Sequence, residues 1–150
     1  MQILIGTDGS HDAIAAAVRA VELLAHADVV TLVCIVETPA LASAGLESGF
    51  AGGVADPEQV DAAWDAVHAD ARAALDRTAA ALGGTTVETL IEMGAPGPDL
   101  CRLAADLSVD VIAVGSRGQG AIRRALMGSV STHVVNHAPC AVMVLRAGTD

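Results

Sequence analysis

The sequence predicts an α/β protein built on one open, parallel sheet of five strands, in the order 3-2-1-4-5, with helices on both faces. Apolar runs of strand length alternate with amphipathic stretches of helix length along the chain, which is the pattern of strands joined by crossover helices. Most of these runs are almost wholly apolar, as expected of strands that are covered on both faces. The chain has 150 residues and neither an internal repeat nor a linker, so we expect a single domain over residues 1–150.

The strands are predicted from short apolar runs that end in turn residues. Most of these runs are rich in Ile, Leu and Val, whereas the third alternates polar and apolar residues. The expected strands cover residues 2–7, 29–37, 85–93, 109–116 and 140–146.

The helices are predicted from apolar residues at helical spacing, such as Ile14, Val18 and Val21. Pro57 and Gly83 mark the start and the end of the longest helix. The expected helices cover residues 11–26, 57–82, 94–108 and a stretch that ends near residue 138. Residues 38–56 are rich in Gly, Ala and Ser, and we expect a flexible connection there.

The charged residues exclude several classes of function. The net charge is −10, from 18 acidic and 8 basic residues, and the chain has one Trp, one Phe and no Tyr. It therefore has no basic stripe and almost no aromatic surface for stacking, so we expect no binding to nucleic acid. All the basic residues are arginine, which excludes a Schiff-base lysine, a Ser-Lys pair and the lysine of a Walker A loop.

The cysteines and the hydropathy predict a cytoplasmic protein without membrane insertion. Cys34, Cys101 and Cys140 are odd in number, widely spaced and not arranged as CxxC, which is typical of free thiols in a reducing compartment. The first residues, MQILIGTDGS, do not resemble a signal peptide. No apolar run reaches the roughly 18 residues that a membrane span needs.

Two loops that are distant in sequence are expected to face one crevice. In a sheet of this order, ligands bind at the carboxyl ends of the strands where the order reverses, here between residues 7–10 (TDGS) and 115–120 (GSRGQG). Glycines let a backbone approach a sugar or phosphate closely, and Gly128-Ser129 would open a helix whose N–H groups can bind an anion. Tight turns alone would also explain these glycines. Residues 121–127 are expected to form a turn or a short helix.

Asp8 and the histidines each allow two interpretations. Asp8 can cap a helix or close a turn, or it can accept hydrogen bonds from a ribose or a base and reach a metal through water. His133 and His137 are one helical turn apart, a spacing that can bind metal. They lack an HExxH arrangement and a third ligand, so we expect surface histidines.

The chain resembles the universal stress protein family. The spacing Gly115-x2-Gly118-x9-Gly128-Ser129 is similar to that family's ATP-binding signature, G-2x-G-9x-G-[S/T]. The first residues, ILIGTDGS, and the last helix and strand, GSVSTHVVNHAPCAVMVLR, are also similar to the family pattern. Thr7 departs from it, because family members often carry Pro or Val at this position.

The resemblance implies a bound ATP, usually with Mg²⁺ or Mn²⁺, and a set of residues around it. Thr7 and Asp8 would lie beside the adenine and ribose, and Ile35 or Val36 would line the adenine pocket. The ribose and phosphates would contact Val114, Gly115, Arg117 and Gly118, and the phosphates would be held by Gly128, Ser129, Val130 and Ser131.

The resemblance also implies a regulatory function and a homodimer that pairs through residues 140–146. The expected function is an ATP-binding stress-response protein that signals to an unknown partner, with slow ATP hydrolysis at most. One alternative is an adenine-nucleotide hydrolase that cleaves between the α and β phosphates, although residues 7–12 (TDGSHD) do not match the SGGxDS loop of such enzymes. A dimeric scaffold without nucleotide is the other alternative.

Overall fold

The structure is a computed structural model, and it describes residues 1–40, 56–118 and 127–146. The chain runs β-α-β, then through α3 to three further strands with helices between them. The elements are β1 (Gln2–Gly6), α1 (His11–Leu23), β2 (Val29–Val36), α3 (Pro57–Ala81), β3 (Glu88–Met93), α4 (Pro96–Asp106), β4 (Val111–Gly115), α5 (Ser129–His137) and β5 (Ala141–Leu145).

The five strands form one sheet in the order β3-β2-β1-β4-β5, and all four ladders are parallel. The predicted fold class and strand order are therefore confirmed. In the register, Ile5 of β1 lies between Leu32 of β2 and Ala113 of β4, so the middle of the sheet is apolar across three strands. Parallel strands with this composition need cover on both faces.

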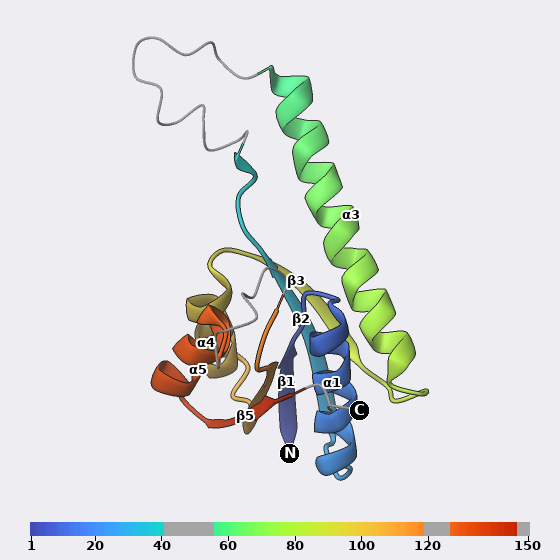
Figure 1. Ribbon diagram of the computed structural model, residues 1–150, viewed down its shortest axis with the longest axis vertical. Helices are drawn as coiled ribbons and strands as arrows, with labels where there is room; N and C mark the ends of the chain where they lie inside the picture. Colours follow the sequence, from blue (N-terminus) through green and yellow to red (C-terminus); the bar gives the residue numbers. More distant parts are fainter. Residues whose placement is uncertain (41–55, 119–126, 147–150) are drawn as a thin grey trace.

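The helices supply that cover as two layers (Figure 1). Alternate residues of each strand point to opposite faces, so Ile3 and Ile5 of β1 pack with buried residues of α1 and α3, whereas Leu4 packs with α4 and α5. Small side chains such as Ala17 and Ala20 are fully buried at the α1 layer. They allow the helix to lie close to the sheet.

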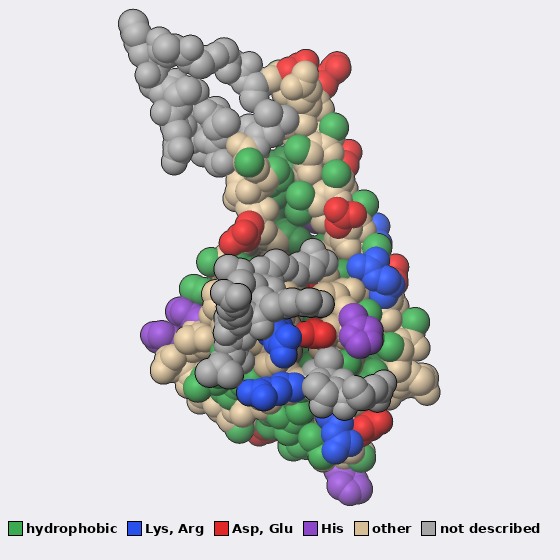
Figure 2. All heavy atoms as spheres, viewed as in Figure 1, with side chains coloured by type: hydrophobic (Ala, Val, Ile, Leu, Met, Phe, Trp, Pro, Cys, Tyr) green, Lys and Arg blue, Asp and Glu red, His purple; other side chains and the backbone are tan. Residues whose placement is uncertain are grey.

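The helix α3 projects beyond the sheet at its N-terminal end (Figure 1). Its buried residues begin only at Ala71, although the helix starts at Pro57. Figure 2 shows acidic side chains along this projecting part and Arg side chains on the body below it. No helix in the described part of the chain is long and apolar enough to span a membrane.

The observed elements differ from the predicted ranges only at their ends. The strand predicted from residue 85 begins at Glu88, because Gly83 and Gly84 have positive φ angles and the Thr85 hydroxyl donates to the Leu82 carbonyl at 2.9 Å, which continues the turn after α3. The helix predicted over 11–26 ends at Leu23. Most of the connection predicted over 38–56, and most of the turn predicted over 121–127, lie outside the described residues.

Candidate functional site

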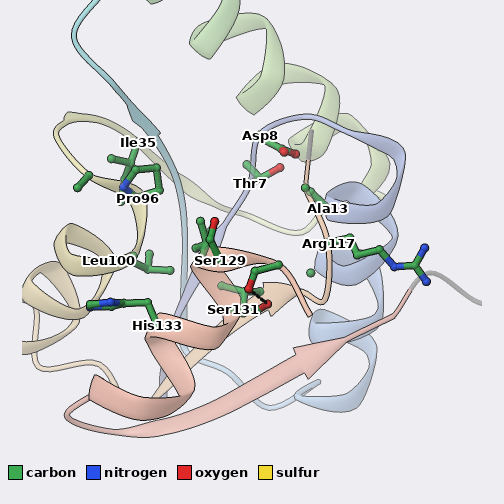
Figure 3. A pocket seen from close by; sticks show the side chains of 18 of the residues that line it. Thr7, Asp8, Ala13, Ile35, Pro96, Leu100, Arg117, Ser129, Ser131 and His133 are labelled. Carbon is green, nitrogen blue, oxygen red and sulfur yellow. Dashed lines mark hydrogen bonds between the residues drawn. The ribbon is translucent and has the colours of Figure 1, made fainter. Parts of the chain in front are cut away.

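A cavity of about 760 Å³ opens at the carboxyl ends of the strands next to β1. Its walls come from the β1–α1 turn, the end of β2, the loop after β4 and the N-terminal ends of α4 and α5 (Figure 3). The sheet order reverses at this point, because β1 lies between β2 and β4. Both the position and the volume are those of a small-molecule site in a parallel α/β fold.

The β1–α1 turn holds Asp8 at one side of the cavity. Oδ1 of Asp8 accepts a hydrogen bond from the Ser10 N–H at 3.0 Å, and the Ser10 hydroxyl caps α1 by accepting from the Ala13 N–H at 3.2 Å. Gly9 has a φ of +69°, a conformation that glycine adopts without strain. Asp8 therefore closes a turn, and the same turn leaves it lining the cavity.

The loop after β4 passes directly beside this turn. A Cβ atom at Gly118 would lie 2.7 Å from Oδ2 of Asp8, and one at Gly115 would lie 3.0 Å from the carbonyl oxygen of Arg117. Neither glycine has a positive φ. A side chain at either position would crowd an atom that is already there, and at Gly118 that atom belongs to the β1–α1 turn, so the absence of a side chain lets the two loops lie close together.

Gly128 differs from both of these glycines. It is the N-cap of α5, with φ −76° and ψ 165°, a conformation open to any residue. A Cβ atom there would lie 3.5 Å from the nearest atom outside the adjoining residues, the carbonyl oxygen of Ser116, which is an ordinary contact. Neither the backbone conformation nor the described neighbours require glycine at this position.

The first turn of α5 lines the cavity, and its backbone donors have no acceptor within the helix. The N–H groups of Ser129, Val130 and Ser131 precede the first intrahelical bond, which joins Thr132 N–H to the Gly128 carbonyl at 3.0 Å. The turn has no acidic residue, and no side chain caps it. The Ser131 hydroxyl is buried and has two backbone acceptors within reach, the Gly128 carbonyl at 3.0 Å and the Ser116 carbonyl at 3.3 Å, so its single proton is used within the protein.

The N-terminus of α4 lines the same cavity but has different chemistry. Pro96 and Pro98 have no N–H to donate, and the Ala95 N–H already donates to Oδ2 of Asp99 at 2.7 Å. Hydrogen bonds from Arg102 and then from Ala95 lower the pKa of Asp99, against a smaller opposing effect of burial. The Asp99 carboxylate is therefore the anion at the N-terminus of α4.

The structure brings the predicted site residues together, with one exception. Those that line the cavity are Thr7, Asp8, Ile35, Val114, Gly115, Arg117, Gly118, Gly128, Ser129, Val130 and Ser131. The exception is Val36, which points to the opposite face of the sheet and packs in the core cluster of α1 and α3. Ile35 and Val36 cannot share a pocket, because successive side chains of a strand alternate between faces. The Arg117 side chain is exposed and points away from the cavity (Figure 3).

The lining also contains residues that the sequence interpretation missed. Pro96, Gly97 and Leu100 come from α4, and His133 comes from α5. His133 lies one helical turn after Ser129, and this spacing alone could have indicated that the two share a face. The α4 residues carried no such signal, because their place at the cavity depends on how the helix packs.

The remaining reactive side chains do not form a further centre. His133 and His137 stack with their ring centroids 4.2 Å apart, and the described residues contain no group of three side chains that could hold a metal ion. Burial, and to a lesser degree the nearby Asp8 carboxylate, raise the pKa of the Cys34 thiol. Cys34 is therefore kept protonated, which makes it a poor nucleophile.

Comparison with known proteins gives a consistent result. Residues 1–146 match the universal stress protein family. A universal stress protein of Staphylococcus haemolyticus is 34% identical over 146 residues, which cover 96% of this chain and 83% of the relative. Universal stress protein UspA from Lactobacillus plantarum is 27% identical, with a TM-score of 0.76 and 97% of each chain covered.

A universal stress protein solved in complex with cAMP is 25% identical to this chain. Its TM-score is 0.63, and the match covers 99% of this chain and 98% of the other. By the family match over nearly its whole length, and by its identity to the staphylococcal protein, the chain belongs to the universal stress protein family.

Proposed function

We propose that this protein binds an adenine nucleotide in the cavity beside β1, with a phosphate group at the N-terminus of α5. The observation that carries the proposal is the combination of Gly128 and the first turn of α5. Three N–H groups there have no acceptor within the helix, and the helix dipole adds to their attraction for an anion. A phosphate also gives position 128 a reason to lack a side chain, which the described protein neighbours do not.

A comparison of the four described helices supports this choice of anion site. Each of the other three has an acidic residue in its first turn: Asp12 in α1, Glu58 in α3 and Asp99 in α4. A carboxylate at that position already compensates the helix dipole. Helix α5 is the one described helix with neither such a carboxylate nor a side-chain cap, so it is the helix that an external phosphate would complete.

The apolar part of the cavity wall suits a base. Val33, Leu100 and Val114 line the cavity and are almost fully buried, and Ile35 is half-buried. A planar purine gains from leaving water for such a surface. Asp8 lines the cavity beside Gly118 of the loop after β4, where its carboxylate can accept a hydrogen bond from a ribose hydroxyl.

Within this class, we propose ATP, with Mg²⁺ or Mn²⁺ carried on its phosphates. The described residues offer no metal site of their own, so the ion would arrive with the nucleotide. The related structure in complex with cAMP makes a nucleotide with a single phosphate the natural competitor. Residues 119–126, which include Arg123 and Arg124, lie outside the residues that the structure describes.

The proposed role is regulatory binding in a stress response rather than rapid turnover. The chain contains no lysine, so it lacks the lysine that commonly stabilises charge during phosphoryl transfer. The alternative is a hydrolase that cleaves between the α and β phosphates, but this chain does not contain the SGGxDS loop of such enzymes. We propose the cytoplasm as the setting, where Cys34, Cys101 and Cys140 would remain the free thiols that they are in the structure.

The direct test is to identify what the protein carries and what it binds. Freshly purified protein is denatured, and any released nucleotide is identified by chromatography and mass spectrometry. The emptied protein is then titrated by calorimetry with ATP, AMP and cAMP, each with and without Mg²⁺. We expect adenine nucleotide in the extract and the tightest binding for Mg-ATP. No nucleotide in the extract and no heat with any of the three would exclude the proposal, and tighter binding of cAMP would replace ATP as the ligand.

We also propose that two copies pair through β5. This strand is at one edge of the sheet and consists of the uncharged sequence AVMVL, whereas β3 at the other edge carries Glu88 and Glu92. An uncharged edge strand presents unpaired backbone groups that favour pairing with another strand. Antiparallel pairing with the β5 strand of a second copy would cover it.

The hydrogen bonds of β5 define a sharp test. The Ala141 N–H donates to the carbonyl of Asp110, the residue before β4, at 3.2 Å. The Leu145 carbonyl accepts from the N–H of Ser116, the residue after β4, at 2.7 Å. The backbone groups of residues 141, 143 and 145 therefore point to β4. Those of Val142 and Val144 point to the outer edge, because strand residues alternate.

Val142→Pro removes an outward N–H and keeps the hydrogen bonds to β4, so we expect a folded monomer. Met143→Pro, the control, removes an inward N–H and should lower stability instead. Light scattering that shows a monomeric wild type at micromolar concentration would exclude pairing.

A further inference from the structure

A buried chain of hydrogen bonds joins the β1–α1 turn to α3. The hydroxyl oxygens of Thr7 and Thr78 lie 2.9 Å apart, although the two residues are 71 positions apart in the sequence. Thr7 is 7% exposed and Thr78 is 0% exposed. The Gly9 N–H donates to the Thr7 hydroxyl at 3.1 Å, and the Thr78 hydroxyl donates to the Ala74 carbonyl at 2.8 Å.

The direction of every bond in this chain follows from the number of protons. A threonine hydroxyl has one proton to donate and lone pairs that accept. Because Thr78 donates its proton to Ala74, the proton between the two hydroxyls belongs to Thr7. The order is therefore Gly9 N–H to Thr7, Thr7 to Thr78, and Thr78 to the Ala74 carbonyl. Removal of either hydroxyl leaves a buried polar neighbour without its partner, which is costly.

A second observation shows how closely the turn lies on α3. A Cβ atom at Gly9 would lie 2.7 Å from Cα of Ala74, so only glycine allows the turn this close to the helix backbone. On its other side, the turn is tied to β2, because the Thr7 N–H donates to the Val33 carbonyl at 2.9 Å. The turn is thus held between the sheet and α3.

We propose that Thr7 and Thr78 are positioning residues for the nucleotide site, which hold the β1–α1 turn against α3 and thereby fix the Asp8 carboxylate at the cavity. The inference rests on the proposed function. Asp8 is the residue next to Thr7, and its Oδ1 depends on the turn for its bond from Ser10. Thr78 does not line the cavity, so it acts through the turn. The hydroxyl at position 7, where this sequence departs from the family pattern, has its partner in α3.

The main test is Thr78→Val, which removes the hydroxyl and keeps the shape of the side chain. We expect the affinity for Mg-ATP to fall about fivefold, equivalent to about 1 kcal/mol, the typical worth of one hydrogen bond. Amide hydrogen exchange at Gly9 and Ser10, measured without nucleotide, should become faster, because these two N–H groups report the bonds to Thr7 and Asp8. Thr78→Ser restores the hydroxyl and should bring the affinity to within about twofold of wild type.

Thr85→Val is the matched control. The Thr85 hydroxyl also donates to a backbone carbonyl, that of Leu82 at 2.9 Å, but it lies beyond the C-terminal end of α3. Its loss should lower stability by a similar amount and leave both the nucleotide affinity and the exchange at Gly9 unchanged. If Thr78→Val fails to fold, Thr7→Val breaks the same bond between the hydroxyls and keeps the Thr78 bond to Ala74. Because Thr7 lines the cavity and accepts from the Gly9 N–H, the readout for this variant is exchange at Ser10, which reports the Asp8 bond.

A double variant shows whether Thr78 acts through Asp8. If it does, Thr78→Val combined with Asp8→Ala should bind no more weakly than Asp8→Ala alone, because the two losses are not additive. Wild-type affinity in Thr78→Val, or fully additive losses in the double variant, would overturn the proposal. If the wild type binds no nucleotide, the proposed function fails, and so does the predicted effect of Thr78 on nucleotide affinity. The exchange rates at Gly9 and Ser10 then still decide whether Thr7 and Thr78 hold the turn.

Discussion

The N-terminal ends of α4 and α5 open on the same cavity and offer it opposite chemistry. Helix α4 begins with Pro96-Gly97-Pro98, and Oδ2 of Asp99 occupies the Ala95 N–H. Helix α5 has three donors, no cap and no acidic residue in its first turn. The difference teaches that two helix starts at one cavity are not equivalent: the sequence of α4 supplies an acceptor for its own N-terminus, whereas that of α5 leaves its N–H groups available for the proposed phosphate.

The two helices also differ in why each has a glycine near its start. A Cβ atom at Gly97 would lie 2.8 Å from Cβ of His133, whereas one at Gly128 would make only ordinary contacts. Gly97 therefore serves the packing of α4 against α5. Gly128 has no such packing role among the described residues, which is consistent with the proposed phosphate at this helix start.

The largest expected effect is that of Gly128→Val on nucleotide binding. A β-branched side chain at the N-cap would occupy the space where a phosphate must come within about 3 Å of the N–H groups. We expect calorimetry to show an affinity for Mg-ATP at least about 100-fold lower, equivalent to about 2.7 kcal/mol. The circular dichroism spectrum should stay close to that of wild type. Unchanged affinity in the folded variant would make Gly128 a turn residue and remove the basis of the comparison.

A smaller effect, on stability, is expected for Gly97→Ala. The added methyl group collides with a Cβ atom that cannot move without the α5 backbone, so the free energy of unfolding should fall by about 2 kcal/mol. Gly128→Ala, the same change at the other helix, should lower the urea midpoint less, because its methyl group makes only ordinary contacts and the remaining cost is that Ala is a poorer N-cap than Gly. Equal midpoints for the two variants would show that the glycines do not differ in the way that their neighbours indicate.

The smallest effect is expected for Pro98→Ala, which gives α4 a further N–H. Because the carboxylate of Asp99 already lies at this helix start, an added donor should not attract the phosphate. We expect the affinity for Mg-ATP to stay within about twofold, or about 0.4 kcal/mol. A marked gain in affinity would mean that the phosphate lies nearer to α4 than to α5.

Much of the fold and of the site could be predicted without coordinates. Runs such as VVTLVCIV in β2 indicate buried strands, and the glycine spacing from Gly115 to Gly128 predicts a nucleotide site in a place where the structure has a cavity. The two loops could be paired from the strand order alone. The strand and turn signals are local, because each depends on residues within one element or one turn, and local patterns are visible in a sequence.

Only the tertiary structure decided which face each strand residue takes and which distant residues meet. Ile35 and Val36 look equivalent in the sequence, yet the sheet directs them to opposite layers. The bond between Thr7 and Thr78 has no sequence signal at all, because it joins residues 71 positions apart. Such contacts depend on the packing of α3 and β1 against each other, and that packing is a property of the whole core rather than of either segment.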